Sequence, residues 1–577
     1  MFYKLCLLSV IAITSCTSTI KDDELYTHEV FDAPAVKVSE SQKYAFRIGY
    51  LVHNNKIEEA VDALFTAKNE DPYFFHSGIL SQFGLQLLEK GLASQDPQDV
   101  LSSLIGIKIA RDDRALHFIE ERGSFDNPEL ELLRLTILAG IDRQDADLLL
   151  LSALRSNYLF VRMQAAYLLA EKKHPAAYEH IEALMHKLGD EYTYLFPRLF
   201  ALDATYHSTQ MLRKLLFDAN ETARIEAIMA CRDFMRDDFL SDIRRLASDP
   251  SPRQQEACAA ALAAFKDEQA IEVLSKVAEL KNPSFLAAHT ALHSLGVTTS
   301  EAYIIQEARE GNLFAIRALG GIPAGRDLLY TLQQEGDIAV RVNATLALLE
   351  LQDSACLLGL KTLFIDSHSD LAFHPIYSAA GAHSACRVTC CSQELIKKRP
   401  ILLEESLRLR QQALIDVMNL GAEEFLLVAS AIFEQNQKDL IPCCIRLLEA
   451  MRSDAAIKLL KEYEQKPGAP YVRAWCQLAL YRLDEPGPWA DRLRTFLEKY
   501  DADEVFHARP QLALTRQAEG GAHELHLDES SELVIQTYLA LAEKQNEEAC
   551  NELLEAIRDG NEHNRFALGG LLIRSSQ

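Results

Sequence analysis

The sequence predicts an all-α fold in which helix pairs stack into an α-solenoid. Helix-start signals built on Asp or Asn return at steps of 25 to 33 residues between positions 96 and 337. Alanine- and leucine-rich amphipathic stretches follow these starts, and several starts have an arginine four or five residues later. About thirty residues cannot enclose a core alone, so units of this length must stack on one another.

The first sixteen residues resemble a bacterial lipoprotein signal peptide. Lys4 precedes an apolar run over residues 5–13, which is too short to span a bilayer. The run "ITSC" ending at Cys16 is similar to a lipobox. The resemblance implies that the Cys16 thiol carries a diacylglyceryl group, and Thr17 after it implies the outer membrane, facing the periplasm. An ordinary cleaved signal and an incorrectly assigned start are the alternatives.

The next two segments lead into the repeats. Residues 17–42 are polar and lack periodicity, which predicts a tether between lipid and folded body. Residues 43–93 predict degenerate helical hairpins, and "NNKIEEAVDALFTAKNEDP" is similar to a tetratricopeptide-type hairpin.

Residues 94–352 predict the regular repeats. In the unit Asp249–Leu280, Asp249 and Pro250 provide a helix start, because the carboxylate accepts from free N–H groups and proline needs no partner there. An alanine-rich face and a second apolar face follow at helical spacing. Comparable starts are Asp96, Asn127, Asn157, Asp190, Asn220, Asn282, Asn312 and Asp337.

These units resemble HEAT repeats, in the short form known from bilin-lyase-type proteins, with Asp or Asn at the turn and Val-Arg opening the first helix. The resemblance covers about residues 95–352 and again 471–500. It implies a right-handed solenoid that binds other molecules along a curved surface. Some members attach bilin chromophores, but no catalytic residue set matches here, so no enzyme activity is carried over.

The same resemblance implies a structural role for the recurring arginines. Each is expected to bond to the turn Asp or Asn of its own or an adjacent repeat, which makes a buried ladder and not a ligand site. The residues assigned to this ladder are Arg162, Arg224, Arg253, Arg317 and Arg341.

Residues 353–437 break the repeat and predict an irregular helical region. They gather several groups that can ligate zinc, namely His368, His374, His383 and Cys386. Their spacing matches no known metal loop, and His383 and Cys386 fall along an alanine-rich helix. We therefore predict no metal site here.

Residues 438–577 predict further degenerate repeats and a terminal cap, because the open end of a solenoid needs a polar face. His523 and His526 lie in "GGAHELHLDESSE", whose spacing is not that of HExxH. A solvated loop is the expected structure. No cofactor is predicted from any part of the chain.

The bulk composition excludes some classes of function. The formal net charge is -25, whereas nucleic-acid binding needs basic groups that displace counterions from phosphates. Forty-eight per cent hydrophobic residues supply ample core for a folded chain.

The cysteines argue against export. Ten thiols remain after loss of Cys6 and lipidation of Cys16, and most lie in apolar helical runs. Adjacent pairs such as Cys443-Cys444 point in different directions on a helix and do not bridge. We expect small buried hydrophobes, which suit a reducing compartment.

The predicted function is a non-enzymatic scaffold, tethered by lipid in the bacterial envelope, that binds a protein partner along the solenoid surface. One alternative is a lyase-like or enzyme-associated modifying factor, which a converging polar pocket on the concave face would favour. Another is a cytosolic assembly factor, if the signal is not real.

Overall fold

The computed structural model describes residues 40–70, 78–141, 144–280, 282–365, 400–499, 505–509, 526–544 and 547–576. Most of these residues are helical, as an α-solenoid requires, so the predicted fold class is confirmed. Cys16 and the tether up to residue 39 lie outside the described residues.

Helices follow one another in pairs through the first half of the described chain. Its helices are α2 (Glu40–His53), α3 (Ile57–Glu70), α4 (Ile79–Leu92), α5 (Pro97–Ala110), α6 (Asp113–Arg122), α7 (Pro128–Ala139), α8 (Gln144–Ala153), α9 (Leu159–Glu171), α10 (Ala177–Leu188), α11 (Pro197–Asp203), α12 (Tyr206–Leu216), α13 (Glu221–Asp233), α14 (Leu240–Leu246), α15 (Pro252–Ala264), α16 (Ile271–Ala278), α17 (Phe285–Ser294) and α18 (Glu301–Arg309).

The second half continues the pairs to the C-terminus. Its helices are α19 (Leu313–Ala318), α20 (Arg326–Glu335), α21 (Ile338–Glu350), α22 (Leu357–Phe364), α25 (Pro400–Leu420), α26 (Ala422–Glu434), α27 (Ile441–Met451), α28 (Asp454–Gln465), α29 (Pro470–Arg482), α30 (Trp489–Lys499), α31 (Glu529–Glu543), α32 (Glu547–Asp559) and α33 (Asn564–Ser575).

Short 3-10 turns and one small strand pair complete the described structure. The turns are η2 (Asp190–Leu195), η3 (Asp237–Phe239), η4 (Glu268–Ala270), η5 (Thr298–Ser300), η6 (Leu319–Gly321), η7 (Pro323–Gly325) and η8 (Ser354–Cys356). The strands β1 (Ala508–Arg509) and β2 (His526–Leu527) are antiparallel, with Ala508 opposite Leu527.

Helix starts follow the predicted chemistry in some repeats only. Tyr158 and Ser284, not the predicted Asn157 and Asn282, directly precede α9 and α17, and α11 begins seven residues after Asp190. Asp96, Asn127 and Asn220 cap α5, α7 and α13 through their side chains. In α15 the capping residue is Ser251, and Asp249 instead accepts from the Ser251 N–H at 3.0 Å. The predicted start at Asp249-Pro250 was therefore two residues early, because Pro252 takes the first helical position.

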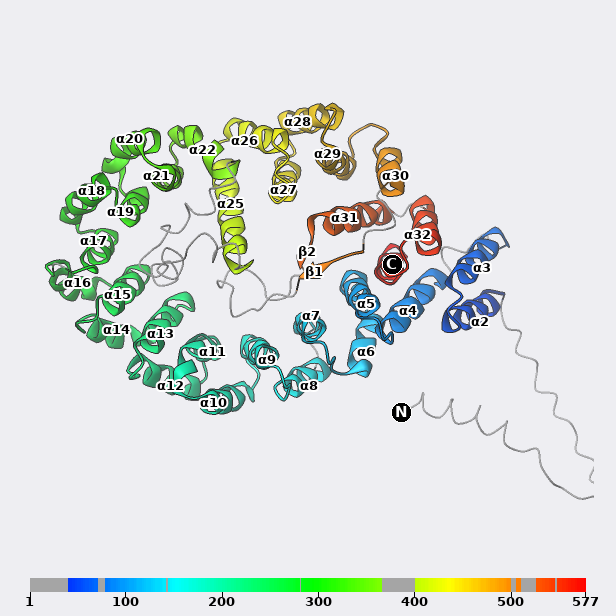
Figure 1. Cartoon of the computed structure of the whole chain (residues 1–577), viewed down its shortest axis with the longest axis horizontal. Coiled ribbons are helices and arrows are strands. Elements are labelled where there is room, and N and C mark those ends of the chain that lie inside the picture. The colour runs from blue at the N-terminus through cyan, green and yellow to red at the C-terminus, as the bar shows by residue number, and fades with distance from the viewer. Residues whose placement is uncertain are drawn as a thin grey trace, which may run out of the picture.

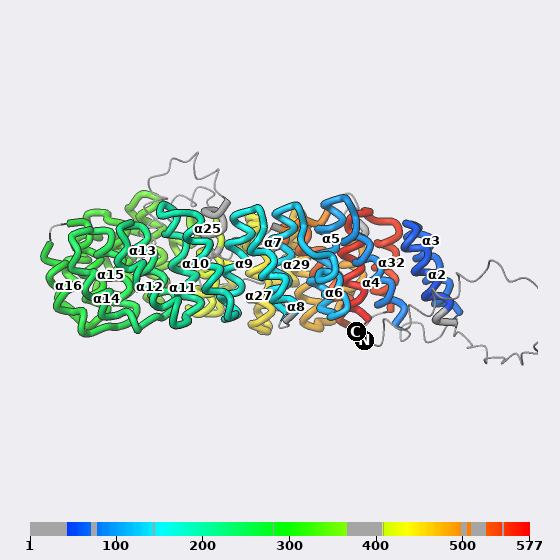
Figure 2. The backbone as a smooth tube through the Cα atoms, turned by 90° about the horizontal axis from the view of Figure 1, so that it is seen from below, coloured from blue at the N-terminus to red at the C-terminus, as the bar shows by residue number. Residues whose placement is uncertain are grey.

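The helix pairs curve into a closed ring (Figure 1). Odd-numbered helices from α5 onward form the inner layer, and even-numbered helices from α6 onward form the outer layer. Seen edge-on, the ring is a flat band with helices running across its depth (Figure 2). Inner helices contact their inner neighbours and their outer partners, which is the packing that a stacked repeat needs.

The ring closes because the last helix packs against the first ones. Helix α33 contacts α4 and α5 extensively, and α32 contacts α3. One hydrophobic cluster accordingly joins residues from both chain ends, including Phe83, Ile105, Phe566 and Leu571. The expected polar cap at the C-terminal end was wrong, because α33 is buried against the N-terminal helices and leaves no open repeat face there.

Glycines permit the close approach of α33 to α4 and α5. A Cβ on Gly84 would lie 2.5 Å from the Gly569 carbonyl oxygen, and a Cβ on Gly106 would lie 2.8 Å from the Phe566 carbonyl oxygen. A Cβ on Gly570 would overlap the Gly106 carbonyl. The pair Gly569-Gly570 is therefore a packing surface for the two N-terminal helices.

None of the helices among the described residues combines the length and the apolar character needed to cross a bilayer.

Candidate functional site

The main candidate site is an apolar groove on the inner layer of the ring. It has a volume of about 470 Å³ and is lined by side chains of α13, α15, α17 and α19 only. Most of its lining is small, so neighbouring helices leave a shallow hollow between them. The lining residues are Arg232, Ala259, Ala260, Ala263, Ala264, Ala287, Thr290, Ala291, Ser294 and Phe314.

The groove is apolar along its length and has a cationic group at one end. Arg232 Nη2 lies 2.6 Å from an oxygen of Asp233, and that carboxylate also accepts from Arg198 Nη1 at 2.7 Å. The two arginines thus share one half-buried carboxylate. Arg232 thus gives the groove an ion-paired polar end at α13, while alanines and Phe314 form most of the remainder.

Glu256 is a half-buried carboxyl on the inner helix α15. Burial raises the pKa of Glu256 to about 7, and the nearby Arg253 charge opposes this rise. The side chain is therefore partly protonated near neutral pH, which makes it a titratable group on the same helix as the groove alanines.

Arg224 shows how a ladder arginine is held. Its Nη1 donates to the backbone carbonyls of Asp218 and Ala219 at 2.9 and 3.1 Å, and its Nε donates to Gln254 Oε1 at 2.6 Å. The side chain therefore joins the turn before its own helix to the next inner helix. The partners are backbone carbonyls and an amide, and not the side chain of the turn Asn.

Arg253 does not occupy the ladder position, and its expected burial was wrong. Arg253 is exposed, whereas Gln255 is buried and donates from Nε2 to the Asp249 carbonyl at 2.8 Å. That bond spans six residues, as does the bond from Arg224 to Asp218. Ser284 Oγ on the next repeat donates to Gln255 Oε1 at 2.6 Å. The shift of the cap to Ser251 explains why Gln255 takes this place.

The other ladder residues lie half-buried on inner helices. Arg162 is on α9, Arg341 is on α21, and Arg317 on α19 pairs with Glu350 of α21. Arg317 pairs with a carboxylate, whereas Arg224 donates to backbone carbonyls and an amide. The contacts of these two ladder residues are therefore not uniform.

The described cysteines are free and buried. They are Cys231, Cys258, Cys356, Cys443, Cys444, Cys476 and Cys550. Burial raises the pKa of the Cys356 thiol to about 12 and raises the pKa of Cys258 and Cys476 further. Such thiols are poor nucleophiles at neutral pH.

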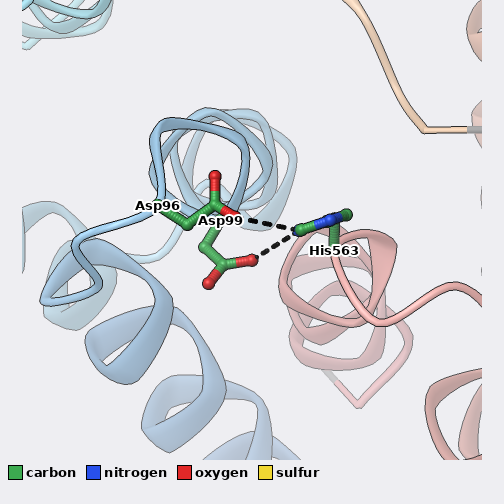
Figure 3. A group of neighbouring side chains, drawn as sticks. All are labelled: Asp96, Asp99 and His563. Carbon is green, nitrogen blue, oxygen red and sulfur yellow. Dashed lines mark hydrogen bonds and ion pairs between the residues drawn. The ribbon is translucent and has the colours of Figure 1, made fainter.

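A second polar cluster lies where the ring closes (Figure 3). His563 Nδ1, at the start of α33, is 2.8 Å from Asp99 and 4.0 Å from Asp96, both at the start of α5. Three ligand atoms within 4.8 Å of one another could hold a metal ion. However, Asp96 already caps α5 at Gln98 N, and Asp99 also accepts from Ser94 Oγ. The cluster is satisfied as a polar contact between the chain ends.

The zinc-ligating groups considered from the sequence lie outside the described residues. This applies to His368, His374, His383, Cys386 and His523, and to the side chain of His526, whose backbone is in β2. The expectation of no metal at these positions stays a prediction.

Comparison with known proteins supports the repeat assignment. Residues 209–296 match the family model of HEAT repeats. This segment runs from α12 to the end of α17 and includes most of the groove. No curated protein matches the sequence. Together with the all-helical ring, the match supports a HEAT-like repeat protein, a class of helical scaffold that often binds proteins.

Two structural features were not predicted from the sequence. The first is the contact between chain ends, for which the only signal is the glycine pair in "RFALGGLLI". The second is the exposed aromatic face of α2, where Phe46 and Tyr50 are four residues apart. Helical spacing shows that the two aromatic residues share one side of a helix. Only the folded structure shows whether that side faces the core or solvent.

Proposed function

We propose that this chain is a non-enzymatic protein-binding scaffold, held by lipid on Cys16 in the bacterial envelope, whose partner binds on the inner surface of the ring. The groove across α15 and α17 carries the proposal. It is shallow and lined mostly by small apolar side chains, which suits an apolar segment of a protein better than a small polar substrate. HEAT-like repeats as a class support a protein ligand.

Binding is tested by placing a charge in the groove. Ala264 is exposed at the groove, and Ala302 is exposed on the outer helix α18. We expect Ala264→Arg to reduce recovery of co-purifying proteins in affinity isolation from membranes with mild detergent, because an arginine fills the hollow. Ala302→Arg is the matched control and should leave recovery unchanged. Equal recovery with both variants would contradict a partner on the inner surface.

The anchor is tested separately. Cys16→Ser removes the acceptor for the lipid, so labelled palmitate should vanish from the protein and the protein should move to the soluble fraction. Equal labelling of both proteins rejects the lipoprotein assignment.

A cytosolic assembly factor is the second candidate, and the free thiols favour it. The seven buried cysteines of the described chain, none of them in a disulfide, are compatible with a reducing compartment. If the protein fractionates with the cytosol and lacks lipid, this function replaces the envelope scaffold, while the groove remains its binding surface.

A further inference from the structure

The inner helix α15 has one exposed stripe, which joins the groove to a carboxyl group. Within this helix the residues that are not buried recur every three or four positions, and they are Pro252, Arg253, Glu256, Ala260, Ala263 and Ala264. Ala260, Ala263 and Ala264 line the groove. Glu256 precedes Ala260 by one helical turn, so its side chain lies on the groove side of α15, next to the groove alanines.

The Glu256 carboxylate has no bonded partner. Among the residues that the structure describes, it forms no hydrogen bond and no ion pair, and Arg253, three residues earlier, acts on it only through its charge. Burial raises the pKa of Glu256 to about 7. The folded protein has therefore removed part of the hydration of this carboxylate without supplying a bond in its place.

No cation of the neighbouring helices bonds to Glu256. The helices α13 and α17 flank α15 in the inner layer, and the outer helix α14 packs behind it (Figure 1). On α13, Glu226 is half-buried at the matching position of the previous repeat, and Arg224 is bonded to Gln254 and to backbone carbonyls. The ionisable groups of α17 are two histidines, one stacked on a tyrosine and one bonded to a backbone carbonyl. The Glu256 carboxylate is thus open to a cation from outside the chain.

We infer that the groove takes an apolar segment that carries a basic side chain, and that Glu256 binds the lysine or arginine of that segment. The inference rests on the proposed function, because the apolar part of the same segment must lie on the groove alanines. An opposite charge favours the ionised form of a carboxyl group, whereas an apolar cover favours the neutral form. A half-buried carboxylate without a bonded partner therefore gains from a cation and is penalised by a purely apolar cover.

The two kinds of occupant predict opposite pH dependence. A basic group binds the ionised form of Glu256, so its affinity rises as the pH increases through about 7. A purely apolar occupant binds the protonated form, so its affinity falls over the same range. Between pH 6 and pH 8 the ionised fraction of a group whose pKa is about 7 changes by about tenfold, which makes this window the informative one.

The probes are two capped helical peptides. Both have leucines along one side, and one peptide has a lysine one turn beyond the leucines where the other has a glutamine. Binding to the full chain, purified in mild detergent, is measured by the fluorescence anisotropy of the labelled peptides at pH 6 and pH 8. Ala264→Arg fills the hollow and gives the level of binding outside the groove.

We expect the wild-type chain to bind the lysine peptide about fivefold more tightly than the glutamine peptide at pH 8, as for a well-placed ion pair. This preference should shrink at pH 6. Glu256→Gln should bind both peptides alike at both pH values. Glu268→Gln is the matched control and should keep the preference, because it removes an exposed carboxylate beside the outer helix α16.

Equal affinity for the two peptides at pH 8 overturns the inference, as does tighter binding of the lysine peptide at pH 6 or an unchanged preference in Glu256→Gln. In each of these cases, binding of the glutamine peptide that Ala264→Arg abolishes still supports the proposed apolar groove. If neither peptide binds more tightly to the wild-type chain than to Ala264→Arg, the groove holds no apolar segment. The proposed function then fails together with this inference.

Discussion

Arg224 and Arg253 lie one repeat apart and have opposite surroundings. Arg224 is half-buried and donates to two carbonyls and an amide, whereas Arg253 is exposed. In the sequence each of the two arginines follows its turn Asp or Asn by four residues, so both were predicted to have the same structural role. The difference arises from Ser251, which moves the start of α15 by two residues and brings Gln255 into the bonding position.

We predict that Arg224→Ala destabilises its repeat and that Arg253→Ala does not. Truncating Arg224 leaves the Asp218 carbonyl and Gln254 without a charged donor, which costs about 1.5–3 kcal/mol. Truncating an exposed side chain typically costs less than about 0.5 kcal/mol. Hydrogen exchange should increase in α13 and α15 for Arg224→Ala only. Similar exchange in both variants would argue against the ladder.

Glu256 makes stability depend on pH. Its folded pKa of about 7 exceeds the ordinary value of 4.5, so the folded chain keeps a proton that the unfolded chain releases. The proton on Glu256 therefore contributes fully to the free energy of unfolding below about pH 4.5, and this contribution is lost as the pH rises to about 7. Glu256→Gln should remove this decline. The difference in urea midpoint between the variant and wild type should therefore increase from about pH 4.5 to about pH 7. A constant difference would show that the pKa of Glu256 is not raised in the folded chain.

At the scale of elements, the helix α33 depends on two glycines. Gly569 and Gly570 face α4 and α5 so closely that backbone atoms meet backbone atoms. The similar pair in "IRALGG" has another role, since Gly321 is exposed and no atom lies within 4 Å of its added Cβ. The same dipeptide thus serves a tight helix crossing in one place and a turn in the other.

We predict that Gly570→Ala loosens the contact between α33 and α5. Its Cβ would overlap the Gly106 carbonyl, and backbone cannot move aside as a side chain can, so the cost is about 1–3 kcal/mol. Hydrogen exchange should rise in α4, α5 and α33. Gly321→Ala is the control and should be neutral, because the added methyl meets open space. Unchanged exchange in Gly570→Ala would mean that the helices cross less closely.

The helices themselves were predictable, whereas their boundaries were only partly so. Caps such as Asp96 and Asn220 act as their positions indicated, because a side-chain oxygen before an apolar periodic run has one favourable use. Asp249 shows where the prediction of helix boundaries from cap residues fails. Asp249-Pro250 and Ser251-Pro252 both offer a cap followed by a proline, so local chemistry alone does not decide between them, and α15 uses Ser251.

At the scale of the whole molecule, closure was not predictable. Repeats imply a curved stack, but a small change of rotation per repeat decides between an open superhelix and a ring. The contact between Asp99 and His563 joins residues 464 positions apart, and no periodicity links them. The groove likewise depends on four helices meeting at one curvature.

We predict that the ring has no fraying end. In an open solenoid the terminal repeats exchange fastest, because they lack a neighbour. Here α33 amides should be as protected as those of α15. Ending the chain after His563 should increase exchange in α4 and α5 and enlarge the radius of gyration measured by small-angle scattering. If both quantities stay unchanged, α33 does not hold the ring closed.

The position of α33 in the sequence also delays the burial of apolar residues of α4 and α5 during synthesis. Helices α4 and α5 leave the ribosome early, yet their covering helix begins only at Asn564, about 450 residues after α5 ends. At about 5–20 residues per second, this delay is roughly 20–90 s. During that time Leu87 and Ile105, which are fully buried in the finished ring in one cluster with residues of α33, lack their final cover. The nascent chain therefore presents an apolar surface that a holding chaperone can bind until α33 has been synthesised.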